Sequence, residues 1–216
     1  MKKNQVYALL IYFGFTFLGT LFKNSFKYAD DVLVMIFDLV VISTILISVL
    51  HLLRDDLKIT SFETKKTTVK KSIIVIIIGV LLDVLVTILI LLLPSVVFYT
   101  SNENLADINS AFKYLPLAII HTVLITPILE ELIFRRILFR VSSKKFNILL
   151  GSIFSSLIFS TVHMPTTSSS FLLLFMHAII YSYCYYRTNR LSVPIILHSI
   201  WNLFIIIGFI LQNFNK

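Results

Sequence analysis

The stretch TPILEELIFRR, residues 126–136, places two adjacent glutamates and two arginines inside an otherwise apolar segment. Carboxylates are costly to hold in the hydrocarbon of a bilayer, so an ionisable group within such a segment marks a candidate functional site, with partners expected in other segments. Glu130, Glu131 and Arg135 are the key members of the stretch. Two histidines in later apolar segments, His163 and His198, are candidates for those partners.

The composition of the whole chain indicates a membrane protein. Its 216 residues are 57% hydrophobic, and the mean hydropathy is +0.92, far above the balance of a soluble domain. The net charge of +8 would suit nucleic acid or anionic lipid, but the basic residues gather in short loops between apolar runs. That placement follows membrane topology and makes a nucleic-acid partner unexpected. Cys184 is the only cysteine, which excludes an internal disulfide and a cysteine-based metal site.

Apolar runs predict an all-α polytopic transmembrane helical bundle, because a spanning helix needs about 20 mostly apolar residues. We expect seven spans, with the fifth and sixth short: 5–22, 32–53, 72–98, 114–140, 146–163, 171–187 and 191–212.

The charge pattern predicts the orientation of these spans. Placing the amino terminus inside gives cytoplasmic segments that are more basic than their outer neighbours, which favours N-in and C-out. The cytoplasmic basic residues would be Lys2, Lys3, Arg54, Lys58, Lys65, Lys66, Lys70, Lys71, Arg140, Lys144, Lys145, Arg187 and Arg190.

Helical spacing predicts different roles for the two glutamates of the stretch 126–136. Glu131 and Arg135 stand one turn apart on one face and suit an ion pair, whereas Glu130 points about 100° away. Glu131 and Arg135 would then brace the segment and leave Glu130 for general-base chemistry. The alternative is a buried charge network without a reaction.

His163 ends the fifth predicted span, with Phe159 one turn before it. His163 and Glu130 lie on consecutive helices at nearly equal distances from the turn at 142–147. In an antiparallel hairpin, this spacing predicts similar depth and a facing pair. A histidine near a membrane boundary is otherwise an interfacial residue.

His198 and Asn202 form a second i, i+4 pair near the start of the last span. Both side chains can donate hydrogen bonds from one face, as an oxyanion-stabilising pair must. The alternative is a polar clamp between packed helices.

Other polar residues carry less information. Asp38 and Asp83 lie inside early spans, where they would pair or line a polar cavity, and His51, His121 and His177 have no motif partner. The chain has no Gly-x-Ser-x-Gly elbow, His-Glu-x-x-His zinc motif, P-loop or dinucleotide fingerprint, which argues against serine hydrolases, common zincins and nucleotide-driven pumps.

Three motifs on separate predicted spans, Glu-Glu-x-x-x-Arg (130–135), Phe-x-x-x-His (159–163) and His-x-x-x-Asn (198–202), together resemble the CPBP family. This family comprises CAAX prenyl endopeptidases and bacteriocin-processing or bacteriocin-immunity enzymes, formerly grouped under the Abi domain. The resemblance covers about residues 113–212, so we expect a catalytic membrane domain there, with residues 1–112 completing the bundle. Arg136 stands where many members of the family have glycine.

The resemblance implies an intramembrane glutamate-dependent endopeptidase. Glu130 would activate water with His163, His198 and Asn202 would stabilise the oxyanion, and Glu131, Arg135 and Phe159 would support the site. We expect no cofactor. A zinc ion held by Glu130, His163 and His198 is the alternative for water activation.

We therefore predict a multi-pass protease of a bacterial plasma membrane, acting on a membrane-associated peptide or protein; the oligomeric state is left open. The main rival is a non-catalytic membrane scaffold or bacteriocin self-immunity protein that keeps the polar cluster for packing. A transporter with buried acids is a third class, which predicts an internal repeat that the sequence does not display.

Overall fold

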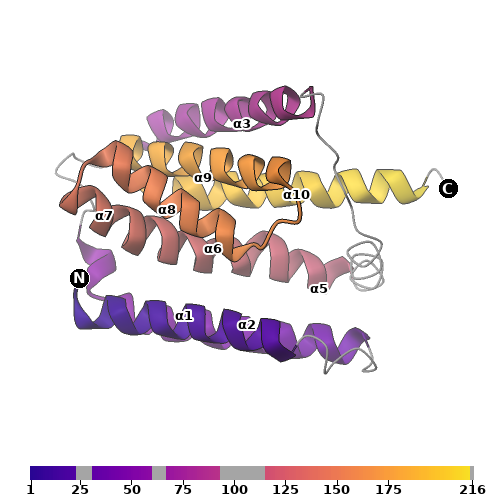
Figure 1. The fold of residues 1–216 in the computed structure, drawn as a ribbon, viewed down its shortest axis with the longest axis horizontal. Helices are drawn as coiled ribbons and strands as arrows, with labels where there is room; N and C mark the ends of the chain where they lie inside the picture. Colours follow the sequence, from indigo (N-terminus) through magenta and orange to yellow (C-terminus); the bar gives the residue numbers. More distant parts are fainter. Residues whose placement is uncertain (23–30, 60–66, 93–114, 215–216) are drawn as a thin grey trace. The chain divides into compact units, whose positions relative to one another are not determined.

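The computed structural model describes residues 1–22, 31–59, 67–92 and 115–214, and these residues are helical apart from short turns (Figure 1). The elements in chain order are α1 (Lys3–Phe22), α2 (Asp31–Leu53), η2 (Asp56–Lys58), α3 (Val69–Leu91), α5 (Leu115–Ile119), η3 (Ile120–Ile125), α6 (Thr126–Glu131), η4 (Leu132–Phe139), α7 (Arg140–Lys145), α8 (Ile148–Val162), α9 (Ser168–Thr188) and α10 (Ser192–Phe214). The predicted all-α class is confirmed.

Within the described ranges, four helical stretches are long and apolar enough to cross a membrane: Val32–Leu53, Val69–Leu91, Pro116–Lys145 and Ser168–Thr188. Ile148–Val162 and Ser192–Gly208 are shorter apolar helices. Each of the seven predicted spans overlaps a helical segment, although α1 is not among the four long apolar stretches. Residues 93–98 of the third predicted span and residue 114 of the fourth lie outside the described residues. The N-in and C-out orientation stays a prediction.

The chain divides into two compact units, and the boundary falls inside the long central helix, after Ile133. The first unit contains α1, α2, η2 and the central helix up to that residue. The second contains α3 and the chain from Phe134 onward. The predicted division into a segment that completes the bundle, residues 1–112, and a catalytic membrane domain, residues 113–212, stays a prediction.

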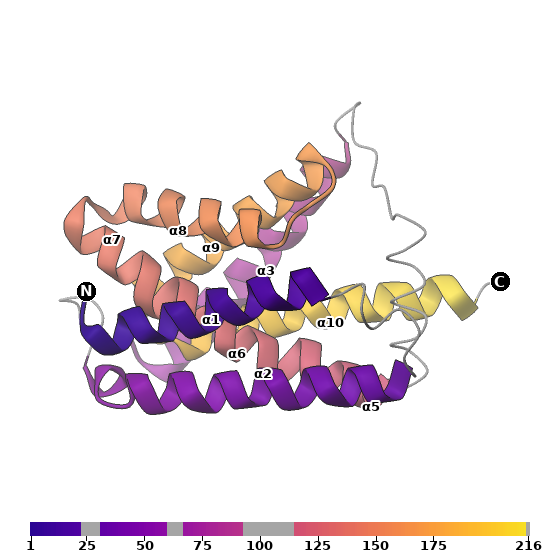
Figure 2. The same cartoon turned by 60° about the horizontal axis from the view of Figure 1, so that its bottom comes forward.

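In the first unit, α1 and α2 pack along one another (Figure 2). Polar contacts join the start of α1 to the end of α2. The Gln5 amide donates to the Asp56 carboxylate at 3.3 Å, the Lys2 ammonium lies 3.8 Å from the same carboxylate, and the Asn4 amide donates to the Leu52 carbonyl at 3.1 Å. These contacts fix the register of the hairpin.

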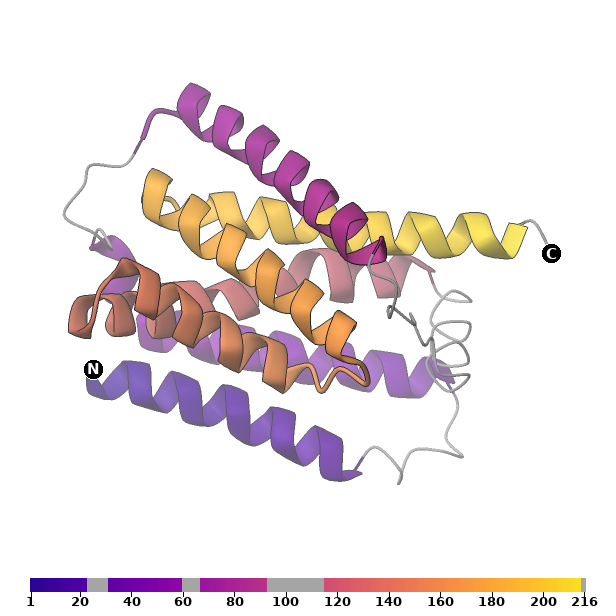
Figure 3. The same ribbon diagram turned by 45° about the horizontal axis from the view of Figure 1, so that its top comes forward.

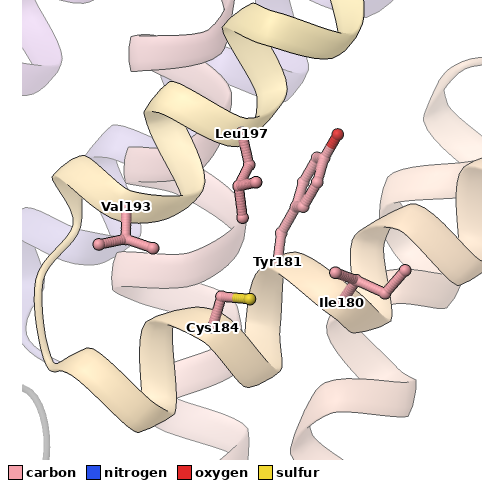
Figure 4. Close-up of a cluster of buried hydrophobic side chains, with 5 residues drawn as sticks. All are labelled: Ile180, Tyr181, Cys184, Val193 and Leu197. Atoms are coloured by element: carbon pink, nitrogen blue, oxygen red, sulfur yellow. The ribbon is translucent and has the colours of Figure 1, made fainter. Parts of the chain in front are cut away.

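In the second unit, α9 packs against α8, α3 and α10 (Figures 1 and 3). Ile180, Tyr181 and Cys184 of α9 meet Val193 and Leu197 of α10 in a buried apolar cluster (Figure 4). The α3 helix joins this cluster through the following residues: Val75, Ile76, Val80 and Val86.

Gly79 allows α3 to approach α10 closely. A Cβ atom at Gly79 would lie 2.8 Å from both δ-carbons of Leu197, a separation that real Cβ atoms do not adopt. Small residues serve this purpose at helix interfaces in membranes. Gly79 is therefore a packing residue rather than a hinge.

The turn before α8 is short and well capped. The helix ends at Lys145, and the Asn147 side chain accepts a hydrogen bond from the Leu150 amide at 2.8 Å as the N-cap of α8. The connection folds α8 back along α7 (Figure 2), as the predicted hairpin requires.

Candidate active site

The central helix, which carries the first motif, is wider than a regular α-helix in two places. Segments Ile120–Ile125 and Leu132–Phe139 are π-helical, and the α-helical segment Thr126–Glu131 lies between them. Pro127 lacks an amide hydrogen and its ring crowds the carbonyl of Val123, which favours widening just before it. Segments of π-helix frequently occur at functional sites.

The second π-helical segment changes the geometry expected for the first motif. The prediction that Glu131 and Arg135 share a face assumed regular α-helical spacing between them, whereas the chain from Leu132 onward follows the wider i→i+5 pattern. The sequence contains no signal for this change. Ser155 of α8 donates a hydrogen bond to the Phe134 carbonyl at 2.7 Å and holds the wider segment against α8.

In the first unit, both glutamates are buried, with side-chain exposures of 7% for Glu130 and 0% for Glu131. Tyr12 of α1 lies within electrostatic range of both carboxylates. His121 lies within range of Glu130 and of Asp38. Tyr12, which is buried, and His121, which is half-buried, are therefore polar neighbours of the glutamates in the first unit that the sequence analysis did not select.

In the second unit, Phe159 joins the residues of the three motifs that lie there. Its ring centroid is 4.4 Å from that of His163 and 5.9 Å from that of His198. The Arg135 guanidinium carbon lies 5.0 Å from the same centroid, in cation–π range. Phe159 is 2% exposed, so the motif phenylalanine supports both histidines and the arginine.

His163 lies directly after α8 and contacts the last turns of that helix. Its Nδ1 atom lies 2.8 Å from the Phe159 carbonyl, and a proton on Nδ1 would complete this hydrogen bond and leave Nε2 as an acceptor. The imidazole is exposed. An exposed imidazole with a fixed ring suits proton transfer to or from a substrate or water.

His198 and Asn202 stand one turn apart on α10, as predicted. The His198 side chain is buried, at 6% exposure, and its ring centroid lies 5.6 Å from that of Tyr181 on α9. Tyr181 also lies in cation–π range of Arg135, at 5.7 Å. Tyr181 is a further residue that sequence reasoning missed, because nothing in its local pattern distinguishes it from a core aromatic.

The structure thus brings together Arg135, Phe159, His163 and His198 within one unit. Glu130 and Glu131 belong to the other unit, so the predicted meeting of Glu130 with the two histidines stays a prediction. No group of three or more His, Cys, Asp or Glu side chains within the described ranges is placed to hold a metal ion. The zinc alternative is a question for experiment.

Comparison with known proteins gives three bacterial relatives. The Bacillus subtilis (strain 168) protein named "Putative membrane peptidase YdiL" is 36% identical over 106 residues, which cover 49% of this chain and 43% of that protein. The Lactococcus lactis protein named "UPF0177 protein YbdI" is 37% identical over 107 residues, covering 49% and 57%. The Staphylococcus aureus (strain USA300) "Membrane-embedded CAAX protease MroQ" is 33% identical over 105 residues, covering 44% and 40%.

These alignments span about half the length of each curated relative. No solved structure matches the chain significantly. The membrane peptidase relatives and the apolar helices together place the chain among multi-pass membrane proteins. The resemblance predicted from the three motifs is confirmed: residues 112–204, which contain all three, match the Rce1-like family of type II CAAX prenyl endopeptidases.

Proposed function

We propose that the chain is an intramembrane endopeptidase of the CAAX protease type, which hydrolyses a peptide bond of a membrane-associated peptide or protein. The observation that supports this most strongly is the convergence of Arg135, His163 and His198 on Phe159, within the segment that matches the Rce1-like family. An exposed imidazole beside a buried imidazole and a buried guanidinium suits proton transfer next to charge stabilisation.

In the proposed reaction, the Glu130 carboxylate removes a proton from water while His163 orients that water. The resulting hydroxide adds to the scissile carbonyl carbon and forms a tetrahedral oxyanion, to which His198 and Asn202 donate hydrogen bonds. Collapse of this intermediate breaks the C–N bond, and the proton held by Glu130 passes to the leaving amine. The products are a carboxylic acid and an amine, which exchange a proton in water to become carboxylate and ammonium, and the Glu130 carboxylate is regenerated.

Glu131 and Arg135 act through their neighbours. Arg135 is completely buried and lies in cation–π range of Phe159 and Tyr181, which fixes the aromatic rings beside both histidines. Its positive charge also favours the anionic intermediate over the neutral substrate, provided that low-dielectric surroundings limit screening. Arg135 and Glu131 are therefore positioning residues in this proposal.

The substrate in this proposal is a peptide leader or a short membrane-anchored tail presented from the cytosol or the inner leaflet. His198 lies early in α10, close to the end that the charge pattern places inside. The name of the Staphylococcus aureus relative describes a CAAX protease, and a tail of that kind is one member of this substrate class. Maturation of a bacteriocin or signal peptide is another.

The test is cleavage of a membrane-presented peptide library by the purified protein in lipid vesicles, beside Glu130→Gln, which preserves side-chain shape. Asp55→Asn, which neutralises an exposed acid in the turn after α2, is the matched control. The proposal requires cleavage by the wild type and the control but not by Glu130→Gln. Cleavage that resists a chelator excludes the zinc alternative. No cleavage by any folded variant would favour the scaffold or self-immunity alternative.

A further inference from the structure

Two segments that are far apart in the sequence are joined at one end of the second unit. The Thr67 amide, just before α3, donates to the carbonyl of Thr188, the last residue of α9, at 3.1 Å. In the turn after α9, Nε of Arg190 donates to the Thr67 carbonyl at 2.7 Å. Figure 3 shows the start of α3 next to the end of α9. These two hydrogen bonds hold the start of α3 against the turn between α9 and α10.

Four basic side chains lie within about one helical turn of this junction along their own segments. They are Lys70 and Lys71 in the first turn of α3, Arg187 in the last turn of α9, and Arg190 in the turn that follows. Lys70, Lys71 and Arg187 are exposed, and Arg190 is half-buried. We refer to these four residues as the basic corner.

The sequence supplies few acids that could neutralise the basic corner. The second unit contains two acidic residues, Glu63, which lies outside the described residues, and Asp83. Asp83 is about 20 Å from Lys70 along α3 at the helical rise. Even with Glu63 beside the corner, four positive charges minus one negative charge leave +3. An anion from outside the unit is therefore the natural partner of this surface.

The Arg190 guanidinium is already fixed at one of its nitrogens. Among the described residues, Nε is the atom of this group that makes a hydrogen bond, so the two terminal nitrogens are available as donors. A planar guanidinium binds phosphate through two parallel N–H donors. Because the Thr67 carbonyl restrains Nε, less side-chain entropy is lost when the terminal nitrogens bind an anion.

The surface of α3 beyond the basic corner is suited to lipid chains. Val69, Ile73 and Ile77 follow one another at one-turn spacing and are 64%, 52% and 55% exposed. The helix is long and apolar enough to cross a membrane, so its first turn lies where headgroups meet hydrocarbon. A phospholipid fits both features at once, since its phosphate can reach the corner while its acyl chains cover the apolar side chains.

We propose that the basic corner binds the phosphate of an anionic phospholipid whose acyl chains lie along α3. The predicted orientation of the spans places this lipid in the inner leaflet. A choline or ethanolamine headgroup would bring an ammonium group against the four cations, so the corner selects headgroups with a net negative charge. The inference concerns binding and is independent of the proposed peptidase reaction.

The turn between α7 and α8 provides a matched comparison within the same unit. Lys144 and Lys145 are both exposed there, and the Lys145 ammonium lies 5.2 Å from the ring centroid of its neighbour Phe146. This turn supplies two cations from one segment, whereas the basic corner gathers four from two segments. A general attraction of basic loops to anionic lipid would treat both pairs of lysines alike, but a binding site distinguishes them.

The binding test adds phosphatidylglycerol to the purified full chain in a neutral detergent and counts bound lipid by native mass spectrometry. Phosphatidylcholine with the same acyl chains is the control lipid, and the wild type should retain phosphatidylglycerol in preference to it. Lys70→Gln/Lys71→Gln should weaken phosphatidylglycerol binding at least about 10-fold, because each cation near an anionic headgroup contributes on the order of 5-fold. Lys144→Gln/Lys145→Gln should bind like the wild type. Equal retention of the two lipids, or equal losses in the two double variants, would overturn the inference.

Arg190→Lys tests the anchored guanidinium, because it keeps the positive charge and removes the planar pair of donors. A ligand that binds the folded state raises its thermal stability. Phosphatidylglycerol should therefore raise the Tm of the wild type and of Lys144→Gln/Lys145→Gln above the Tm in phosphatidylcholine, and should raise that of Arg190→Lys by less. A full rise in Arg190→Lys would contradict the proposed phosphate contact, even if the hydrogen bond to Thr67 is lost and both Tm values fall together.

A soluble headgroup tests whether the acyl chains contribute to binding. Glycerol phosphate carries the phosphate without the chains that we place along α3. It should fail to displace phosphatidylglycerol from the wild type at equal concentration in the same native mass spectrometry assay. Displacement at equal concentration would show a site for free phosphate, contrary to the inference of a lipid.

Discussion

Phe159→Ala should destabilise the second unit strongly, because Phe159 makes four specific ring contacts. Besides the His163 and His198 rings, the Phe159 ring packs edge-to-face on the Phe134 ring, with centroids 5.0 Å apart. The guanidinium carbon of Arg135 lies 5.0 Å from the Phe159 ring centroid. Aromatic pairs contribute about 1 kcal/mol each, and a desolvated cation–π contact contributes about 2 kcal/mol. The expected loss is about 5 kcal/mol, at the upper end of the range of roughly 3–5 kcal/mol measured for buried Phe→Ala changes.

The matched control is Phe154→Ala on the same helix. Phe154 is 47% exposed, and since lipid tails are as apolar as the side chain, its loss should cost less than about 0.5 kcal/mol. Equilibrium unfolding in bicelles, followed by tryptophan fluorescence of the single Trp201, would measure both free energies. Equal destabilisation by the two substitutions would refute the view that Phe159 holds the site together.

Two further predictions concern packing and pH. Gly79→Ala should destabilise the second unit by about 1–3 kcal/mol through overpacking against Leu197, and Leu197→Ala should relieve this loss in the double variant. Gly14→Ala, which meets nothing within 4 Å, should instead gain up to about 1 kcal/mol in an unfolding assay. The Lys58 ammonium, 2.7 Å from the Asp55 carboxylate, holds the pKa of Asp55 below its ordinary value of 3.8. Any stabilisation of the folded state by this pair is complete above about pH 3.8, the ordinary pKa, and is lost as the pH falls through the lowered pKa of Asp55. Lys58→Gln should raise the pKa of Asp55 in an NMR titration. An unchanged pKa would contradict the pairing.

Hydropathy alone predicted the positions of the helices. The predicted span 146–163 corresponds to α8, Ile148–Val162, and the predicted turn before it contains the Asn147 cap. Apolar runs of this length leave the chain few alternatives to helix in a membrane, because every backbone polar group needs an internal partner. Hydropathy does not report hydrogen-bond register, so it could not predict the π-helical segments on either side of Thr126–Glu131. Pro127 was a sequence signal for the first of them alone.

The candidate site was predicted in part. The motif residues Arg135, Phe159, His163 and His198 come together within one unit. Tyr181 was missed because it contacts His198 and Arg135, which lie on other helices and are remote from it or from its motif pattern in sequence.

The most direct test of the central claim is the kcat/KM of the wild type and of Glu130→Gln on one cleaved peptide, both in lipid vesicles and both shown to be folded. A general base contributes about 10²- to 10⁴-fold to the rate, so Glu130→Gln should fall at least about 100-fold below the wild type. Equal values for the two proteins would contradict glutamate-dependent hydrolysis.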